Sequence, residues 1–254
     1  MDSSPRTAFL VGASAGIGRA LALELLDRGW HVAAGARREQ PLQELAAARP
    51  DAGRRFHAQT LDVTDRDGFG EAYQAVERAI GPVDTLIVNA GDYEPMPLAD
   101  FDPELFRRLM EVNFQGAVNA LAAALPAMLA RGRGQILLTA SLSAYRGLPR
   151  AAPYGASKAA LLNMAESLHP ELARRGVRLR VINPGFVRSR LTDKNDFSMP
   201  DIVSPEYAAA YIARRLGGRG FEIAFPPRFA LALKTLRLLP YRLYFAAIRR
   251  MVGG

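Results

Sequence analysis

Short apolar segments alternate with longer amphipathic segments along most of the chain. The short segments are rich in residues that favour strands, and they predict seven strands at residues 7–11, 31–36, 56–61, 84–88, 135–139, 178–182 and 221–225. Helical periodicity falls between them, at residues 17–28, 41–48, 66–80, 103–130, 153–175 and 205–216. Because strands that are separated by helices pair in parallel, the pattern predicts an α/β protein whose sheet is covered by helices on both faces.

The pattern shows no internal repeat and no flexible linker, so a single α/β domain over residues 1–226 is the simplest organisation of the 254 residues. A tail at residues 227–254 follows the last predicted strand. The longest irregular segment leaves the carboxyl end of the sixth strand, where open α/β sheets bind their ligands. Residues 186–204 are therefore predicted to form a substrate loop.

Composition excludes several kinds of site. The chain has no cysteine, which excludes disulfides, thiolate catalysis and cysteine-based metal centres. Its three histidines, His31, His57 and His169, show no paired ligand spacing, so no metal site is predicted. The first residues lack the pattern of a signal peptide, and no uninterrupted apolar run approaches membrane-spanning length. The expected location is the cytoplasm.

The net charge of +8 is concentrated in the tail. The tail has six basic and no acidic residues: Arg228, Lys234, Arg237, Arg242, Arg249 and Arg250. Apolar residues between them predict two short amphipathic helices, separated at Pro240. One interpretation places these helices on an anionic membrane surface or over the substrate entrance. The favoured alternative packs them on their own domain or on a sister subunit. Without a basic motif interleaved with aromatic residues, nucleic-acid binding is not expected.

The first strand leads into a glycine-rich turn, GASAGIG at residues 12–18, which opens a predicted helix. Glycines at Gly12, Gly16 and Gly18 allow a pyrophosphate to approach the backbone and the N–H groups of the helix N-terminus. The alternative is a tight turn without a ligand, but a strand before the turn and a helix after it favour dinucleotide binding.

The end of the second strand indicates which dinucleotide is bound. An acidic residue there would bind the ribose hydroxyls of NAD, but this chain has Arg37 and Arg38 instead. A planar guanidinium matches the geometry of a phosphate group, so this pair favours NADP over NAD. The alternative is a solvated basic pair.

Tyr154 and Lys158 are four residues apart in a predicted helix and therefore lie on one face of it. An ammonium about 4 Å from a phenol favours the phenolate and would bring the pKa of Tyr154 down from about 10 into a useful range. Ser141 follows the fifth strand at the same sheet edge and is expected to orient a substrate oxygen. Each residue alone has a common structural explanation, a surface pair or a turn, and only the combination with the glycine turn indicates a site.

With these motifs in this order, the chain resembles the classical short-chain dehydrogenases/reductases from about residue 7 to about residue 225. The resemblance implies a Rossmann-type three-layer sandwich with a seven-stranded parallel sheet, followed here by the helical tail. It also implies a catalytic set of four, with Asn113 joining Ser141, Tyr154 and Lys158. A homodimer or homotetramer is expected on the same ground.

The resemblance further implies a cofactor-binding set. Asp62 and Val63 are expected beside the adenine, and a Pro-Gly pair after the sixth strand is expected near the nicotinamide. The complete set consists of Gly12, Ser14, Gly16, Ile17, Gly18, Arg37, Arg38, Asp62, Val63, Asn89, Ala90, Gly91, Tyr154, Lys158, Pro184, Gly185, Val187 and Ser189.

The functional hypothesis is an NADP(H)-dependent oxidoreductase that moves a hydride between nicotinamide and a carbonyl or alcohol substrate. The alternatives are a regulatory protein that binds NADP(H) and a membrane-peripheral protein, both without significant turnover. In the substrate loop, Phe197, Met199 and Ile202 suit an apolar pocket wall, while Arg188 or Arg190 suits an anionic group. A solvated loop with few contacts is the other interpretation.

Overall fold

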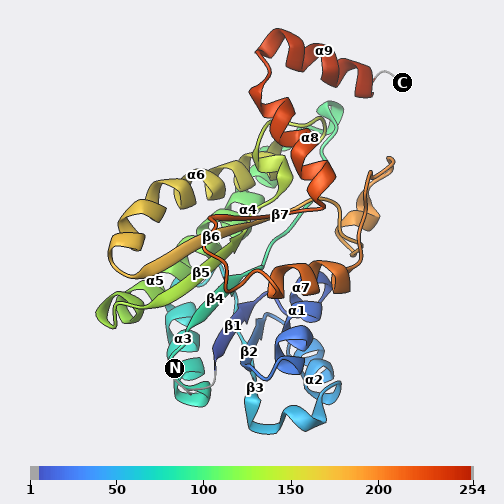
Figure 1. The fold of residues 1–254 in the computed structure, drawn as a ribbon. Coiled ribbons are helices and arrows are strands. Elements are labelled where there is room, and N and C mark those ends of the chain that lie inside the picture. The colour runs from blue at the N-terminus through green and yellow to red at the C-terminus, as the bar shows by residue number, and fades with distance from the viewer. Residues whose placement is uncertain (1–5, 253–254) are drawn as a thin grey trace.

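A seven-stranded parallel sheet forms the middle layer of the molecule (Figure 1). The computed structural model describes residues 6–252. The strands are β1 Thr7–Val11, β2 His31–Ala36, β3 Phe56–Thr60, β4 Thr85–Val88, β5 Gly134–Thr139, β6 Val177–Pro184 and β7 Glu222–Phe225. Their order is β3-β2-β1-β4-β5-β6-β7, and all neighbours are parallel. The predicted α/β fold and its seven strands are confirmed.

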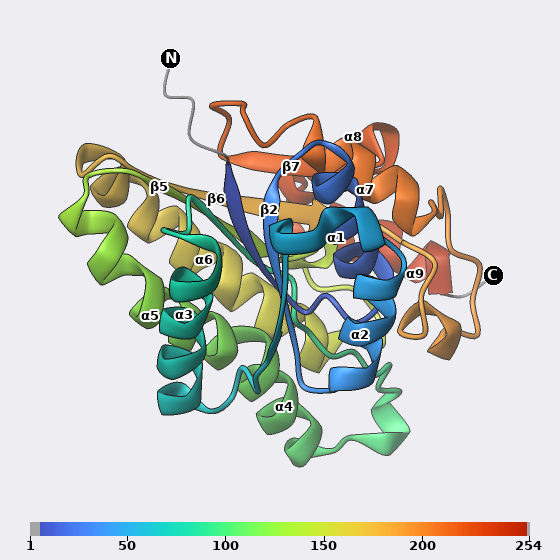
Figure 2. The same cartoon turned by 90° about the horizontal axis from the view of Figure 1, so that it is seen from below.

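Helices cover both faces of this sheet, as Figure 2 shows. The helices are α1 Gly16–Asp27, α2 Glu39–Ala47, α3 Arg66–Ile80, α4 Pro103–Met110, α5 Gly116–Ala130, α6 Ala152–Arg174, α7 Pro205–Ala213, α8 Pro227–Leu238 and α9 Tyr241–Val252. One buried cluster joins α1, α2 and α7 to one face, and another joins α3, α5 and α6 to the other. Two separate cores therefore hold the sheet in a fixed position.

Local signals account for several helix boundaries. The side chain of Asp65 accepts a hydrogen bond from the Gly68 N–H (3.0 Å) and caps α3. Ser204 caps α7 in the same way, accepting from the Tyr207 N–H (3.1 Å), and Pro205 fills the first helical position. The helix predicted at residues 205–216 nevertheless ends at Ala213, because the chain then turns toward β7.

The helix predicted at residues 103–130 is continuous but irregular. A π turn, Glu111–Gln115, separates α4 from α5. By length and composition the whole stretch Pro103–Ala130 is apolar enough to cross a membrane. Its apolar side chains, however, pack on α3 and the sheet, with Ala117, Ala120 and Met128 buried. The apolar character of this helix is explained by its place in the core.

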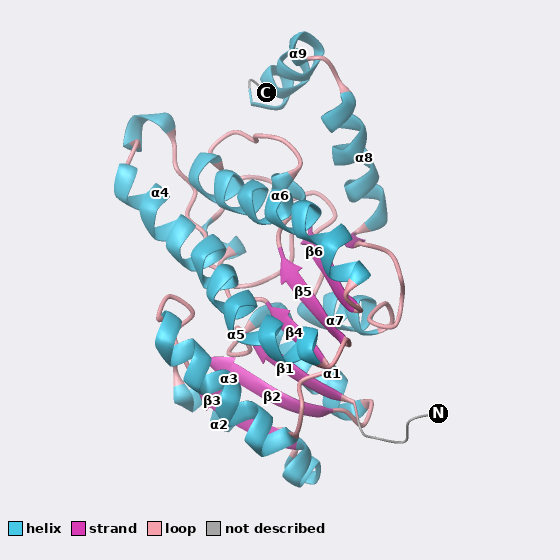
Figure 3. Cartoon of the chain, turned by 90° about the vertical axis from the view of Figure 1, so that its left-hand side faces the viewer, coloured by secondary structure: helices cyan, strands magenta, loops and turns pink. Residues whose placement is uncertain are grey.

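The tail forms the two expected helices, α8 and α9, which meet at Pro240 (Figures 1 and 3). Leu233 of α8 and Tyr244 of α9 are buried against the α/β domain. The inner side of the tail therefore packs on its own domain, as the favoured interpretation predicts. The division of the chain at residue 226 remains a prediction.

Candidate active site at the carboxyl edge of the sheet

The register of the strands brings the predicted site residues to one edge of the sheet. Val11 of β1 lies opposite Gly35 of β2 and Val88 of β4. Leu138 of β5 continues this row, since it pairs with Val88. The segments that follow these strands therefore leave the sheet side by side, although they are far apart in the sequence.

The glycine turn has a geometry that only glycines allow. Gly12 and Gly16 have φ angles of 88° and 53°. A Cβ atom on Gly12 would lie 2.4 Å from the backbone nitrogen of Ala90, and one on Gly18 would lie 2.0 Å from the carbonyl oxygen of Gly12. Ala15 precedes α1 without a capping side chain, so the helix N–H groups suit an anion. Ser14 and Ile17 are half-buried in the same turn.

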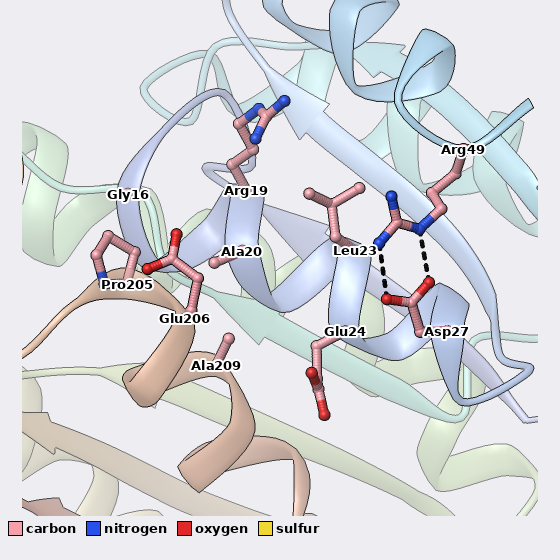
Figure 4. A pocket seen from close by; sticks show the side chains of 10 residues that line it. All are labelled: Gly16, Arg19, Ala20, Leu23, Glu24, Asp27, Arg49, Pro205, Glu206 and Ala209. Atoms are coloured by element: carbon pink, nitrogen blue, oxygen red, sulfur yellow. Dashed lines mark hydrogen bonds and ion pairs between the residues drawn. The ribbon is translucent and has the colours of Figure 1, made fainter.

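A cleft of about 250 Å³ begins at this turn and follows α1 (Figure 4). Gly16 and Arg19 line it from α1, and Glu206 lines it from α7. At its other end Arg49 donates hydrogen bonds of 2.6 and 2.8 Å to Asp27. None of the four predicted catalytic residues lines this cleft.

Arg37 and Arg38 are exposed after β2. Within residues 6–252 neither forms an ion pair with a carboxylate. Arg37 and Asp62 line a second cleft, of about 320 Å³. Asp62 accepts two hydrogen bonds from Thr64, each 2.9 Å, and Val63 is buried against α5. The structure thus brings Arg37 and Asp62 to one cleft.

Asn89 joins three strands at the sheet edge. Its side-chain amide donates to the carbonyl oxygen of Gly12 (3.2 Å), and its backbone N–H donates to Val11 (2.8 Å). The Thr139 hydroxyl at the end of β5 donates to the side-chain oxygen of Asn89 (3.3 Å). The Thr139 backbone carbonyl in turn accepts from Lys158 Nζ (2.8 Å). A continuous chain of hydrogen bonds therefore links the glycine turn to Lys158.

Asn113 lies in the π turn and is buried. Its oxygen accepts from the Asp92 N–H (2.7 Å), while its nitrogen donates to the Asp92 carbonyl (3.0 Å) and to the Ser157 hydroxyl (2.9 Å). A Cβ on Gly91 would lie 3.2 Å from the Asn113 oxygen and 3.3 Å from Lys158 Nζ. The π turn, a feature often found at functional sites, thus places Asn113 beside Gly91 and Lys158.

Tyr154 and Lys158 lie in the first two turns of α6, with Lys158 Nζ 5.8 Å from the centre of the tyrosine ring. Burial raises the pKa of Tyr154 to about 12, although hydrogen bonding with Ser141 acts in the opposite direction. Burial also lowers the pKa of Lys158 to about 8. The expectation that Lys158 makes the phenol acidic is therefore wrong, because loss of hydration dominates at both groups.

Ser141 stands two residues after β5 and begins a short 3₁₀ turn. Its hydroxyl oxygen accepts from the Ser143 N–H (3.1 Å). Hydrogen bonding with the Ser141 side chain also lowers the pKa of Tyr154, against the larger effect of burial. All four residues predicted to be catalytic therefore lie at the same end of the sheet, on the segments that follow β4 and β5.

The segment after β6 approaches the glycine turn. Pro184 is the last residue of β6, and the Gly185 N–H donates to the Phe225 carbonyl (2.7 Å). Val187 is buried, and Ser189 lies beside the glycine turn, since a Cβ on Gly16 would be 3.7 Å from Ser189 Cβ. The predicted nicotinamide-side segment and the glycine turn thus face each other.

Tyr93 also lies beside Tyr154, although it is not among the site residues predicted from the sequence. Its ring packs edge to face on Tyr154, with centres 5.0 Å apart at 82°. Its hydroxyl donates to the Asn195 oxygen (2.6 Å) in the substrate loop. The signal was present, because Tyr93 follows β4 by a few residues and the carboxyl ends of strands line the ligand crevice.

Two ion pairs also hold the substrate loop. Lys194 Nζ lies 2.7 Å from a carboxylate oxygen of Glu94. A guanidinium nitrogen of Arg150 lies 2.5 Å from a carboxylate oxygen of Asp196. At the base of the loop, Phe186 stacks on Phe229 of α8 (5.7 Å). Phe197, expected in a pocket wall, is 42% exposed and packs on Phe186 instead. Arg188 and Arg190 are exposed, without an ion pair in the described part of the chain.

The sequence profile described as short chain dehydrogenase matches residues 6–198. This chain belongs to the short-chain dehydrogenase family. An uncharacterized oxidoreductase of Myxococcus xanthus is 37% identical to it over 250 residues, which cover 98% of this chain and 99% of that protein. The chain is therefore an oxidoreductase of this family, and the similarity includes most of the tail.

Solved structures of the family agree with this assignment. A short chain dehydrogenase from Burkholderia cenocepacia in complex with NADP is 29% identical, with a TM-score of 0.83 over 98% of this chain and 99% of that one. A variant of actinorhodin polyketide ketoreductase with NADPH is 28% identical, with a TM-score of 0.78 over 87% and 95%. These relatives share the nucleotide-binding Rossmann fold.

The glycine turn leads to a first prediction. Gly12→Ala forces a Cβ into the backbone at Ala90 at an unfavourable φ, so we expect the free energy of unfolding to fall by about 2–4 kcal/mol. Gly70→Ala is the control, because Gly70 lies inside α3 with open space around it, and it should stabilise by about 0.5–1 kcal/mol. Urea unfolding measures both; equal effects would contradict the close approach.

Proposed function

We propose that this protein is an NADP(H)-dependent oxidoreductase that transfers a hydride between nicotinamide and a carbonyl or alcohol substrate. Tyr154 is the general acid/base, and Asn113, Ser141 and Lys158 complete the catalytic set. The observation that supports the proposal most directly is the chain of hydrogen bonds from the glycine turn to Lys158, which lies one helical turn from Tyr154.

The residues present fit the cofactor. The glycine turn leaves room for a pyrophosphate at the start of α1, and Arg37 and Arg38, which form no ion pair among the described residues, suit the 2′-phosphate of NADP. Asp62 and Val63 would border the adenine. The nicotinamide side would be lined by Asn89, Ala90, Gly91, Pro184, Gly185, Val187 and Ser189. When bound, NADPH supplies the hydride. The presence of NADP and NADPH in related structures supports this choice.

The site is suited to carbonyl reduction. Because the pKa of Tyr154 is raised to about 12, the phenol carries its proton at neutral pH and can give it to the substrate oxygen. The Ser141 hydroxyl would donate a hydrogen bond to that oxygen. Lys158, still largely charged below its pKa of about 8, would stabilise the phenolate left behind. Alcohol oxidation would use the same groups in reverse.

The surroundings of Tyr154 favour a substrate with an apolar group. Tyr154 packs against a cluster of Met96, Leu105 and Leu109, and Tyr93 adds an aromatic edge. We also propose a cytoplasmic homodimer or homotetramer, which family membership supports. A regulatory protein without turnover would not need a phenol, an ammonium and a hydroxyl at the nucleotide site, and their presence together favours the enzyme.

Tyr154→Phe tests the proton donor. The ring and its packing on Tyr93 remain, so we expect turnover to fall about 10²–10⁴-fold while the Kd for NADPH changes by less than about threefold. A panel of ketones, aldehydes and acyl thioesters, followed by reduced-nicotinamide absorbance, measures turnover. Tyr207→Phe, at an exposed tyrosine, is the control. Full activity of Tyr154→Phe would refute the assignment.

The pH dependence tests Lys158. Below pH 8 both Lys158 and Tyr154 are protonated, so reduction should be fast; above pH 8 the ammonium charge is lost and the rate should fall. Lys158→Arg keeps a positive charge throughout this range, so its profile should lack the inflection near pH 8. Initial rates from pH 6 to 10 give both profiles. An unchanged inflection in the variant would assign it to another group.

Arg37→Gln tests the choice of cofactor. Loss of a charge-assisted contact to the 2′-phosphate should raise the Kd for NADPH about 10–100-fold and leave the Kd for NADH unchanged. Fluorescence titration measures both constants. Arg54→Gln, at another exposed arginine, should change neither. Equal weakening of both cofactors would contradict a phosphate contact.

A further inference from the structure

Exposed apolar side chains are concentrated on the tail. Of the ten large apolar side chains that are exposed within residues 6–250, five lie in α8 and α9. Their exposed fractions are 66% for Leu231, 82% for Leu238, 70% for Tyr241, 56% for Leu243 and 49% for Phe245. A cluster of this kind marks an interaction surface more often than a random scatter of apolar residues does.

The inner side of the tail is anchored. Tyr244 is buried and its hydroxyl donates to the Gly147 carbonyl. The Arg146 guanidinium lies 4.1 Å from the Tyr244 ring centre and 4.6 Å from that of Tyr241, and it donates to the carbonyls of Arg237 (2.9 Å) and Leu239 (2.5 Å). The two helices are thereby held in place with their outer side turned to solvent.

The outer side is organised in the way that interfacial helices are. Leu231 and Leu238 are seven residues apart, hence on one face of α8. On α9, Tyr241 and Phe245 stack with ring centres 5.8 Å apart. Figure 1 shows α9 at the extremity of the molecule, beyond the sheet and its helices. An apolar row therefore lies where a flat surface can reach it.

The charge of the tail identifies the partner. Residues 227–254 carry six basic and no acidic side chains. Arg228, Arg242, Arg249 and Arg250 are exposed and form no ion pair within the described residues, whereas Lys234 pairs with Glu222. A symmetric contact with a second copy would bring two sets of cations together without a carboxylate between them. An anionic lipid surface provides the opposite charge and accepts the apolar row.

We propose that α8 and α9 form a peripheral binding surface for an anionic lipid bilayer. Leu238 and the aromatic pair enter the headgroup boundary, and the arginines contact the lipid phosphates. The exposed side chains of this surface are not among those proposed for hydride transfer, so the inference holds whether or not the proposed reaction is correct.

Vesicle co-sedimentation of the full chain tests the proposal. The protein should sediment with vesicles of phosphatidylcholine and phosphatidylglycerol, and much less with vesicles of phosphatidylcholine alone. Binding should weaken between 50 and about 500 mM salt because the charge contribution is screened. Absence of binding to the anionic vesicles at low salt would overturn the proposal.

Two matched pairs of variants locate the surface. Leu238→Glu should lower the partition coefficient at least tenfold, while Leu98→Glu, at a leucine that is 85% exposed elsewhere, should not change it. The double variant R249Q/R250Q should lower it about 10–30-fold, and R174Q/R175Q, an exposed arginine pair at the end of α6, should have little effect. Circular dichroism verifies that each variant is folded.

The same variants also distinguish binding to a bilayer from other uses of this surface. If both arginine pairs weakened binding equally, the attraction would be a property of the whole charge, and the proposal would fail. Sedimentation equilibrium supplies the remaining comparison. Suppose that the protein does not bind anionic vesicles and forms a dimer that Leu238→Glu dissociates. These results would assign the surface to a second copy of the chain and overturn the proposal.

Discussion

The rest of the site depends on the side chain of Asn89, which holds the ends of three parallel strands together. Its amide and carbonyl groups contact Gly12 and Thr139, and Thr139 holds Lys158. Parallel pairing places strand ends at one edge but does not set how the loops beyond them are spaced. A planar amide with fixed reach sets that spacing, so that the nucleotide turn and the lysine form one rigid unit.

Burial, and not charge attraction, controls the two titratable groups at the site. Tyr154 keeps its proton and Lys158 yields its proton more readily, since each charged form has lost water. An environment of this kind keeps the proton on the phenol at neutral pH. It also makes Lys158 the group whose charge changes first as the solution becomes alkaline.

Local sequence patterns predicted the parts of the site that are local. The glycine turn and the spacing of Tyr154 and Lys158 need only a strand, a turn and a helix, and the fold followed from strict alternation. Asn113 was expected only through family resemblance, because helical periodicity does not reveal a π turn. The contact of Tyr93 with Asn195 joins residues 102 apart. The pKa of Tyr154 was misjudged because sequence shows proximity along a helix but not the loss of hydration.

The substrate loop is held differently at its base and at its tip. Its base is fixed by the stacking of Phe186 on Phe229, whereas its tip is held by Tyr93 and by two ion pairs at the surface. Ion pairs of this kind each contribute about 0–1 kcal/mol. The tip can therefore swing outward as a flap about a stationary root, at small energetic cost and without disturbing either core. In the proposed enzyme, substrate entry and product release would then need a fluctuation of this loop and no refolding.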